Sequence, residues 1–326
     1  MDEHDILTRY LRPLAAGFAP AGGLLDDAAV VQCSEALAIS TDTLVEGVHF
    51  PSGTLSAEQV ARRALRVNLS DLAASGAAPL CYFLSLQLPP TTDVNWMSAF
   101  AAGLRQDQEQ FGLHLAGGDT VRTPGPLAVS LTVMGRVARG DALPRAGART
   151  GDTLLVTGTI GDAHVGRLQM EGRLPADAGA EALAERFLLP TPRLEIGRNL
   201  APLAHAAIDV SDGLTADVRN LCVAAGKGAR IWLAKVPLSE GARSVVKRGH
   251  VTLEELTTGG DDYELLFSVP QHAVREAIET AAESSVMMTA IGEVMDLEEV
   301  TILAPDGGAP RAARGGYVHA WAKPTG

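Results

Sequence analysis

The stretch AIDVSDGLTAD, residues 207–217, ends a short apolar run in two carboxylates and a glycine. The pair Ala207 and Ile208 is typical of a buried strand, and Asp209 and Asp212 follow directly. One such stretch is weak evidence, because Asp and Gly are common in turns. Similar combinations of acids with small residues recur at STDT (40–43), NLSD (68–71), GGDT (117–120) and GGDD (259–262). This repetition indicates that the acids share a function.

The overall composition predicts an acidic globular protein. A chain of 326 residues is long enough for two domains, and its 46% hydrophobic residues can bury a sizeable core. The formal net charge of −12 argues against nonspecific nucleic-acid binding, which needs a basic surface. It also disfavours binding to an anionic membrane surface. We therefore expect neither nucleic acid nor membrane as a partner.

The cysteines and the N-terminus predict a cytoplasmic protein. Cys33, Cys81 and Cys222 are far apart and form no CxxC pair, which argues against a zinc knuckle or a disulfide framework. An odd number of cysteines is expected in a reducing cytosol. The acidic start MDEHDILTRY does not resemble a secretory signal, and no apolar run reaches the roughly 18 residues that a membrane span needs.

The pattern of strands and helices predicts a mixed α/β fold, because it is not a regular βαβ alternation. Residues 56–77 are the clearest helix, with Ser56 and Gln59 at capping-box spacing and Asp71 in the final turns. Further expectations are a hairpin of strands 28–32 and 37–40, a strand 113–116 that precedes GGDT, and helices 192–204 and 213–225.

The segment 138–152 is polar and rich in Gly and Arg, which makes it the best candidate for a domain boundary. We therefore expect an N-terminal domain over 1–138 and a C-terminal domain over 139–326.

Oxygen ligands dominate the candidate site. The chain lacks the GxxxxGK[ST] loop, HExxH, GxSxG and the protein-kinase motifs. Each acid alone is best interpreted as a turn former or a helix cap, but their number favours hard cations, above all Mg²⁺. Bound cations would relieve the repulsion among converging carboxylates and bind phosphate oxygens. The acids that lie at predicted element ends are Asp26, Asp27, Asp42, Asp71, Asp119, Asp209 and Asp212.

Five segments together resemble the thiamine-monophosphate kinase family, which is part of the aminoimidazole ribonucleotide synthetase superfamily. AIDVSDGL or GGDT alone indicates only the superfamily, whereas STDTLVEGVHF with the following helix favours this member. The resemblance extends from about residue 3 to about residue 320. It is carried by AISTDTLVEGVHF (38–50), NLSDLAASGAAP (68–79), LAGGDTVR (115–122), AIDVSDGL (207–214) and GGDDYELLF (259–267).

The resemblance implies an activity, a fold and a set of roles. The activity is the Mg²⁺-dependent transfer of the ATP γ-phosphoryl group to thiamine monophosphate, with several Mg²⁺ ions. The fold is two α/β domains in a homodimer whose N-terminal domains form the dimer sheet. Magnesium-ligand positions match Asp26, Ser40, Thr41, Asp42, Asp71, Asp119, Asp209 and Asp212; nucleotide positions match Phe111, Gly118, Asp119, Arg145 and Ser211; substrate positions match His49, Asp261 and Tyr317.

The chemistry of that reaction agrees with the residues. The acceptor is a phosphate oxygen with a second pKa near ~6, already ionised at neutral pH, so no general base is needed. Catalysis must then come mostly from neutralising the phosphate charges of the two substrates and from holding the reacting groups in line. We expect Asp42, Asp71, Asp209 and Arg145 to act at the reacting groups. Arg145 suits phosphate because its guanidinium can donate two parallel hydrogen bonds.

Two positions depart from the family pattern. Leu25 stands where the family usually has a glycine, and Asp261 stands where a Glu is common. Tyr317 can also simply pack the C-terminus, and Trp321 is an alternative aromatic contact. His49 can instead be a structural histidine.

Other functions stay open at this point. Within the superfamily they are a cyclo-ligase, a selenophosphate-forming enzyme and a hydrogenase-maturation protein. The second would want a reactive cysteine in the N-terminal glycine-rich loop, and residues 17–27 contain none. The third would want a C-terminal cysteine, whereas this sequence ends in AWAKPTG. Outside catalysis, the alternative is a metal or nucleotide sensor, which would bind nucleotide without turnover.

Overall fold

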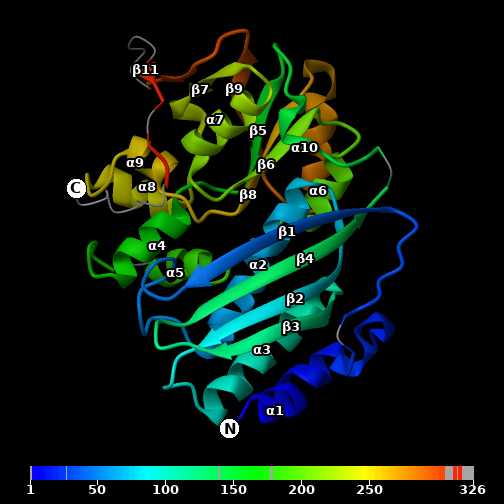
Figure 1. Ribbon diagram of the computed structural model, residues 1–326. Coiled ribbons are helices and arrows are strands. Elements are labelled where there is room, and N and C mark those ends of the chain that lie inside the picture. Colours follow the sequence, from blue (N-terminus) through cyan, green and yellow to red (C-terminus); the bar gives the residue numbers. More distant parts are fainter. Residues whose placement is uncertain are drawn as a thin grey trace, which may run out of the picture. The chain divides into compact units, whose positions relative to one another are not determined.

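The chain is described by a computed structural model over residues 2–26, 28–138, 140–176, 179–304, 311–313 and 315–317. It folds into two compact units (Figure 1). Unit 1 consists of Met1–Leu143 and Leu188–Pro202, and unit 2 consists of Pro144–Phe187 and Leu203–Gly326. The expected domains differ from these units in two segments, because residues 139–143 and 188–202 both belong to unit 1.

Unit 1 is built on a four-stranded sheet with the strand order β1-β4-β2-β3. The β1–β4 and β4–β2 pairs are antiparallel, and the β2–β3 pair at the edge is parallel. Side chains alternate between the two faces of such a sheet. The strands are β1 (Ala36–Val45), β2 (Ala78–Leu88), β3 (His114–Arg122) and β4 (Ala128–Val137).

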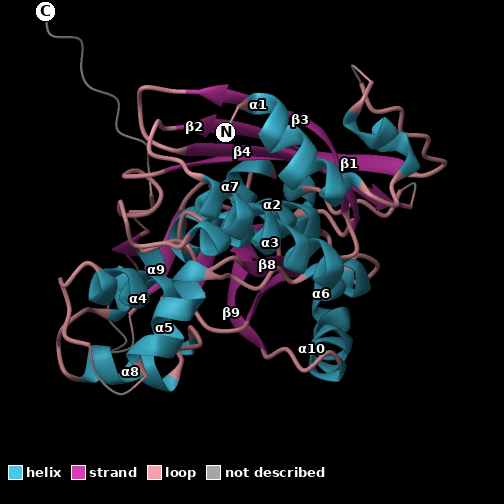
Figure 2. Cartoon of the chain, turned by 90° about the horizontal axis from the view of Figure 1, so that it is seen from below, coloured by secondary structure: helices cyan, strands magenta, loops and turns pink. Residues whose placement is uncertain are grey.

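Two long helices, α2 (Ala57–Ala74) and α3 (Val94–Phe111), lie side by side against one face of this sheet (Figure 2). The predicted capping box of α2 is confirmed, since Ser56 and Gln59 each accept a hydrogen bond from the other's backbone N–H. Asp93 caps α3 in a similar manner, by accepting the N–H of Trp96. The apolar residues of α2 and of the covered sheet face form the core of unit 1.

The N-terminal segment and one later helix complete unit 1. Residues 3–24 form short helical turns, and α6 packs on α2. At that contact a Cβ added to Gly197 would lie 1.9 Å from the backbone oxygen of Ala73, so the close approach of the two helices requires glycine. The elements are α1 (Glu3–Ile6), η1 (Leu7–Leu11), η2 (Arg12–Ala15), η3 (Ala19–Leu24) and α6 (Leu194–Leu200).

Two local predictions were wrong. Residues 28–32 form no strand, and Val30 is 72% exposed, so the expected hairpin with 37–40 does not exist. β1 pairs instead with the distant β4, which offers it ten residue partners. The predicted strand 113–116 extends to Arg122, so GGDT lies within β3 and not after it.

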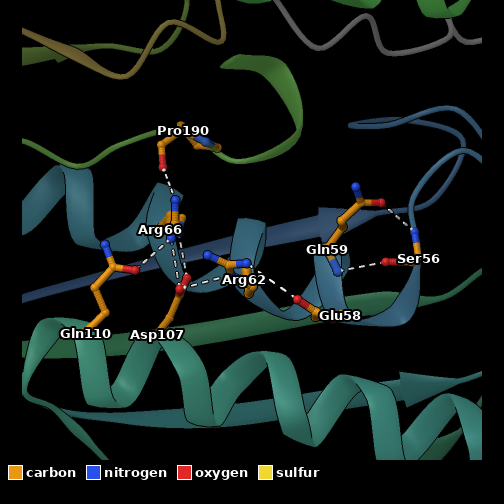
Figure 3. Close-up of polar contacts among 8 residues, drawn as sticks. All are labelled: Ser56, Glu58, Gln59, Arg62, Arg66, Asp107, Gln110 and Pro190. Carbon is orange, nitrogen blue, oxygen red and sulfur yellow. Dashed lines mark hydrogen bonds and ion pairs between the residues drawn. The ribbon is translucent and has the colours of Figure 1, made fainter. Parts of the chain in front are cut away.

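A buried ion pair joins α2 to α3 (Figure 3). Asp107 is fully buried and accepts hydrogen bonds from Arg66 at 2.7 and 3.0 Å and from Arg62 at 3.1 Å. Arg66 also donates to the backbone oxygen of Pro190 at 3.2 Å. This contact ties the segment 188–202 to unit 1. Removing one partner of a buried ion pair is costly, because the other charge stays buried without compensation.

The variant Asp107→Ala is therefore expected to destabilise unit 1 by about 3–5 kcal/mol. The matched control is Glu58→Ala, since Glu58 pairs with Arg62 at the surface and is 42% exposed. Exposed pairs contribute about 0–1 kcal/mol. Urea unfolding followed by circular dichroism measures both. Equal effects of the two substitutions would contradict a structural role for Asp107.

Unit 2 contains a seven-stranded mixed sheet with the order β11-β10-β7-β9-β5-β8-β6. Its apolar core lies between this sheet and helices that include α7. The strands are β5 (Thr153–Thr157), β6 (Ala206–Val210), β7 (Gly228–Trp232), β8 (Glu264–Val269), β9 (Met288–Met295), β10 (Val300–Leu303) and β11 (Arg311–Ala312). The helical elements are η4 (Arg145–Gly147), α4 (Asp162–Met170), α5 (Ala180–Leu188), α7 (Leu214–Ala224), η5 (Leu233–Lys235), α8 (Glu240–Lys247), α9 (Leu253–Thr258), η6 (Gln271–Ala273) and α10 (Val274–Glu283).

Across the described ranges, every helix is too short or too polar to cross a membrane.

Candidate active site

In unit 1 the first group of predicted site residues lies where β1 faces α2. The hydroxyl of Ser40 donates to a carboxylate oxygen of Asp71 at 2.5 Å, and the backbone N–H of Asp42 donates to Asn68 at 2.9 Å. Ser40 and Asp42 are two residues apart in the strand and so lie on the same face. Asp71 reaches them from the last turns of α2, as its position in the sequence predicted. The side chains of Ser40, Asp42 and Asp71 could offer a metal ion oxygen ligands only.

Thr41 lies between these residues in β1, but its side chain points to the opposite face of the sheet. Its hydroxyl donates to the backbone oxygen of Leu131 at 2.9 Å and accepts from Thr132 at 3.1 Å. The side chain of Thr41 is therefore not brought together with those of Ser40 and Asp42.

The second group lines a cavity of about 340 Å³ between the N-terminal segment, β2 and β3. Asp26, Gly118 and Asp119 all border this cavity. Its described lining has two carboxylates and the hydroxyl of Thr120, and it includes no Lys, Arg or His. A polyanion such as a nucleotide phosphate would be repelled there unless cations were bound with it.

The loop that carries Asp26 depends on glycine. Gly22 and Gly23 have φ of 56° and 65°, and a Cβ on Gly22 would lie 2.4 Å from a carboxylate oxygen of Asp26. Leu25, which replaces a family glycine, has φ of −110° and is 74% exposed. The position therefore accepts leucine without backbone strain. Asp27 lies outside the described residues.

These two groups lie at opposite edges of the sheet. Thr43, Ser130, Ser85 and Asp119 are neighbours in one row across β1, β4, β2 and β3. Three strand spacings, roughly 14 Å, therefore separate Asp119 from β1. Accordingly, no group of three or more His, Cys, Asp or Glu side chains within the described part of the chain is arranged to hold a metal ion.

Gly118 allows β3 to approach β2. A Cβ at this position would lie 1.9 Å from the backbone oxygen of Leu84. The variant Gly118→Ala is therefore expected to push β3 away from β2 and to destabilise unit 1 by about 1–3 kcal/mol, because overpacking shifts the backbone. Gly125→Ala is the control, since its nearest neighbour would be the Thr123 hydroxyl at 3.4 Å. Urea unfolding measures both, and equal stabilities would contradict this role of Gly118.

His49 and Phe111 also lie in unit 1. The His49 ring accepts the backbone N–H of Val45 through Nδ1 at 2.9 Å, so the neutral ring carries its proton on Nε2. This bond stabilises the turn after β1. Phe111 ends α3, and the guanidinium of Arg66 lies 5.4 Å from the centre of its ring.

In unit 2, three segments that are distant in sequence are joined by backbone hydrogen bonds. Asp261 N–H donates to the oxygen of Ser211 at 2.8 Å, and Tyr317 N–H donates to the oxygen of Asp212 at 2.9 Å. Asp209 is 4% exposed and precedes this turn at the end of β6. The predicted residues Asp209, Ser211, Asp212, Asp261 and Tyr317 are therefore brought together.

Arg145 begins η4 and is exposed. The preceding residue, Pro144, accepts a hydrogen bond from the N–H of Ala207 at 3.3 Å, which attaches η4 to the start of β6. The backbone at Arg145 thus lies near the N-terminal end of that strand, whereas Asp212 follows its C-terminal end. Trp321, the alternative aromatic contact, lies outside the described residues.

Two partly or fully buried polar residues beside this turn were not among the predicted site residues. Asp217, in the first turn of α7, accepts the N–H of Asp212 at 3.0 Å. Burial, and next the charge of Asp212, raise the pKa of Asp217 to about 7. His164 packs directly on Gly259, where an added Cβ would clash with its ring. The only signal in the sequence that could have pointed to Asp217 as a site residue is that it is one more acid close to Asp209 and Asp212. No sequence pattern points to His164.

Comparisons with known proteins agree with this architecture. The AIR synthase related protein models match residues 25–137 with their N-terminal domain and 149–304 with their C-terminal domain. The fold is thus that of AIR synthase related proteins.

Individual relatives narrow the family. Thiamine-monophosphate kinase of Caulobacter vibrioides is 40% identical over 92% of this chain and 86% of its own length. The crystal structure of thiamine-monophosphate kinase from Stenotrophomonas maltophilia superposes with a TM-score of 0.79 at 39% identity, covering 87% of this chain and 90% of that one. The structure of AaThiL complexed with AMPPCP and TMP superposes with a TM-score of 0.77 at 32% identity, covering 89% of this chain and 90% of that one. The chain belongs to the thiamine-monophosphate kinase family.

Proposed function

We propose that this chain is an ATP-dependent phosphotransferase that converts thiamine monophosphate and ATP to thiamine diphosphate and ADP by direct in-line transfer. The observation that carries this proposal is the AaThiL complex with AMPPCP, an ATP analogue, and TMP, since this chain matches it over nearly its whole length. The acids of the five segments that resemble the family support it.

The donor set suits Mg²⁺. The described site residues offer carboxylates and hydroxyls, which hard cations prefer, and the described lining of the cavity beside Asp119 has no competing cation. When bound, Mg²⁺ would neutralise phosphate charge and polarise the transferred group. The proposed ligands of several Mg²⁺ ions are Asp26, Ser40, Thr41, Asp42, Asp71, Asp119, Asp209 and Asp212. Thr41 would contribute through its backbone oxygen, because its side chain faces away.

The remaining residues bind and orient the two substrates. Arg145 would donate to the nucleotide phosphates, because it is exposed and its guanidinium suits them. His49 would contact the acceptor from the turn after β1. Because the acceptor phosphate is already ionised, no residue has to remove a proton. Nucleotide contacts are proposed for Phe111, Gly118, Asp119, Arg145 and Ser211, and acceptor contacts for His49, Asp261 and Tyr317.

We further propose a homodimer formed by the sheets of unit 1. The face opposite α2 and α3 carries exposed apolar side chains, among them Leu37 at 38%, Ile39 at 57% and Val121 at 43%. An exposed apolar patch is typical of an interface. Asp119 lies on this face as well, two residues before Val121 in β3, whereas Ser40, Asp42 and Asp71 lie on the face toward α2. A face-to-face dimer would therefore bring Asp119 to the interface.

A charged substitution on this face tests the dimer. Ile39→Asp is expected to convert the protein from dimer to monomer in analytical ultracentrifugation, because it places a charge within the apolar patch. The matched control is Val223→Asp, since Val223 is 62% exposed in unit 2. A wild type that sediments as a monomer, or an Ile39→Asp variant that stays dimeric, would contradict the proposed interface.

We propose a cytoplasmic location, which the three dispersed cysteines support, since none forms a disulfide.

A comparison of acceptors tests the function. The protein is incubated with Mg²⁺, ATP and either thiamine monophosphate or thiamine, and the products are separated by chromatography. The proposal expects thiamine diphosphate from the monophosphate and no phosphorylated product from thiamine. Absence of ADP formation with thiamine monophosphate, while nucleotide still binds, would overturn the proposal and favour a sensor.

A further inference from the structure

The loop that carries Asp261 has an unusual backbone. Gly260, Asp261 and Tyr263 all have positive φ, at 71°, 67° and 50°. Residues other than glycine rarely adopt this conformation, because it crowds their Cβ atoms, and they keep it only where the surroundings enforce it. Such strain is concentrated at functional sites. Contacts on both sides of the loop must therefore hold it in place.

Backbone bonds restrain one side of the loop. Asp261 N–H donates to the oxygen of Ser211 and Tyr263 N–H donates to that of Val210, both at 2.8 Å. These bonds continue the pairing of β6 with β8 beyond the strand ends. They place Asp261 beside the Ser211–Asp212 turn but leave the peptide of Asp262 to be held from the other side.

Two side-chain contacts supply that restraint. The carboxylate of Asp262 is 1% exposed, and both of its oxygens accept the N–H of Gly161, at 3.0 and 2.9 Å. Arg186, from α5, donates to the backbone oxygen of Asp262 at 3.4 Å and to Glu264 at 2.6 Å. A single guanidinium thus spans the residues on both sides of Tyr263.

The charges around Arg186 explain why it is held there. Glu264 is fully buried and also accepts from Thr157 at 2.6 Å, while Asp262 and Asp162 lie close enough to interact with the same guanidinium. Burial raises the pKa of Asp262 well above its usual range, and Arg186 opposes that rise. Among these contacts Arg186 is the cation facing three carboxyl groups. Its removal would take a cation away from the buried carboxylate of Glu264.

We propose that Arg186 is a positioning residue that acts through Asp261, holding the loop 259–263 so that this carboxylate meets the acceptor substrate. The inference rests on the proposed function, which assigns Asp261 to the acceptor side. Arg186 itself is not among the residues proposed to contact either substrate. Loss of its bonds lets the peptide of Asp262 rotate and the backbone of Asp261 relax toward an ordinary conformation.

Steady-state kinetics with both substrates varied test the proposal. Arg186→Met is expected to raise the KM for thiamine monophosphate at least ~10-fold while the KM for ATP changes less than ~2-fold. Arg186→Lys can still pair with Glu264 and should recover part of the loss. The matched control is Arg275→Met, because Arg275 is 89% exposed in the same unit. Equal increases in both KM values, or no change, would overturn the proposal.

A double-mutant cycle separates positioning from general destabilisation. If Arg186 acts through Asp261, then Arg186→Met adds less than ~2-fold to the KM for thiamine monophosphate once Asp261 is already alanine. Multiplicative losses would show an independent role and overturn the proposal.

Hydrogen exchange gives a readout that does not depend on turnover. The amides of Asp261 and Tyr263 are expected to exchange at least ~10-fold faster in Arg186→Met than in the wild type or Arg275→Met. Unchanged exchange overturns the proposal. A third outcome is that Arg186→Met exchanges faster while the wild type fails to phosphorylate thiamine monophosphate. That result would support the loop restraint and overturn only the proposed function.

Discussion

Replacing Asp71 with asparagine is expected to reduce turnover by about 10²- to 10³-fold, the usual loss when one preorganised electrostatic contact is removed. Asp71 joins α2 to β1 through its bond to Ser40, and it is the proposed ligand shared by several metals. Asparagine keeps the shape and an oxygen that Ser40 can bond, so the fold should survive. Rates of ADP formation at saturating substrates measure the loss.

The control for this substitution is Asp93→Asn. Asp93 is another carboxylate of unit 1 that accepts a backbone N–H, but it caps α3 and asparagine caps equally well. Its turnover should stay within ~2-fold of wild type. If Asp71→Asn also retained turnover within a few-fold, Asp71 would not be a central metal ligand.

Removing Mg²⁺ is expected to abolish nucleotide binding as well as turnover. The cavity near Gly118 is lined by the carboxylates of Asp26 and Asp119 and, among its described residues, by no cationic side chain. We expect the affinity for AMPPCP to fall at least ~100-fold in EDTA, which is roughly 2.7 kcal/mol. Calorimetric titration with and without Mg²⁺ measures the difference.

Thermal unfolding in EDTA without nucleotide is the control for that experiment, because it separates loss of binding from loss of the fold. Equal affinity for AMPPCP with and without Mg²⁺ would contradict the proposal that cations neutralise the phosphates in this cavity.

Local signals predicted much of the fold. The capping box at Ser56 and Gln59 and the cap at Asp93 set the starts of both long helices, because each depends on residues within one turn. The position of Asp71 near the end of α2 follows from the same helix. Features fixed by a few neighbouring residues were thus predictable.

Features fixed by distant partners were not. Residues 28–32 have the composition of a strand, but β1 finds its partner in β4, about 90 residues later in the chain. The helix predicted at 192–204 exists in shortened form as α6, yet its periodicity cannot indicate that it packs on α2 in unit 1. Pairing and packing partners require tertiary contacts that sequence patterns do not encode.

The site shows the same division. The acidic segments were recognisable as a set, and the turn at Asp209, Ser211 and Asp212 is joined to the GGDD loop. The separation of Asp119 from β1 could not be predicted, because it depends on the strand order. Arg186 was missed for a related reason, since it reaches the loop from a helix far away in sequence.

The transfer of labelled phosphate tests the central claim most directly. Wild-type protein and Asp71→Asn are incubated with Mg²⁺, thiamine monophosphate and ATP labelled in its γ-phosphate. We predict that the wild type forms thiamine diphosphate carrying the label, with one ADP per product, and that the variant forms almost none. Label released as inorganic phosphate without thiamine diphosphate, or no loss of ATP at all, would contradict the proposed reaction.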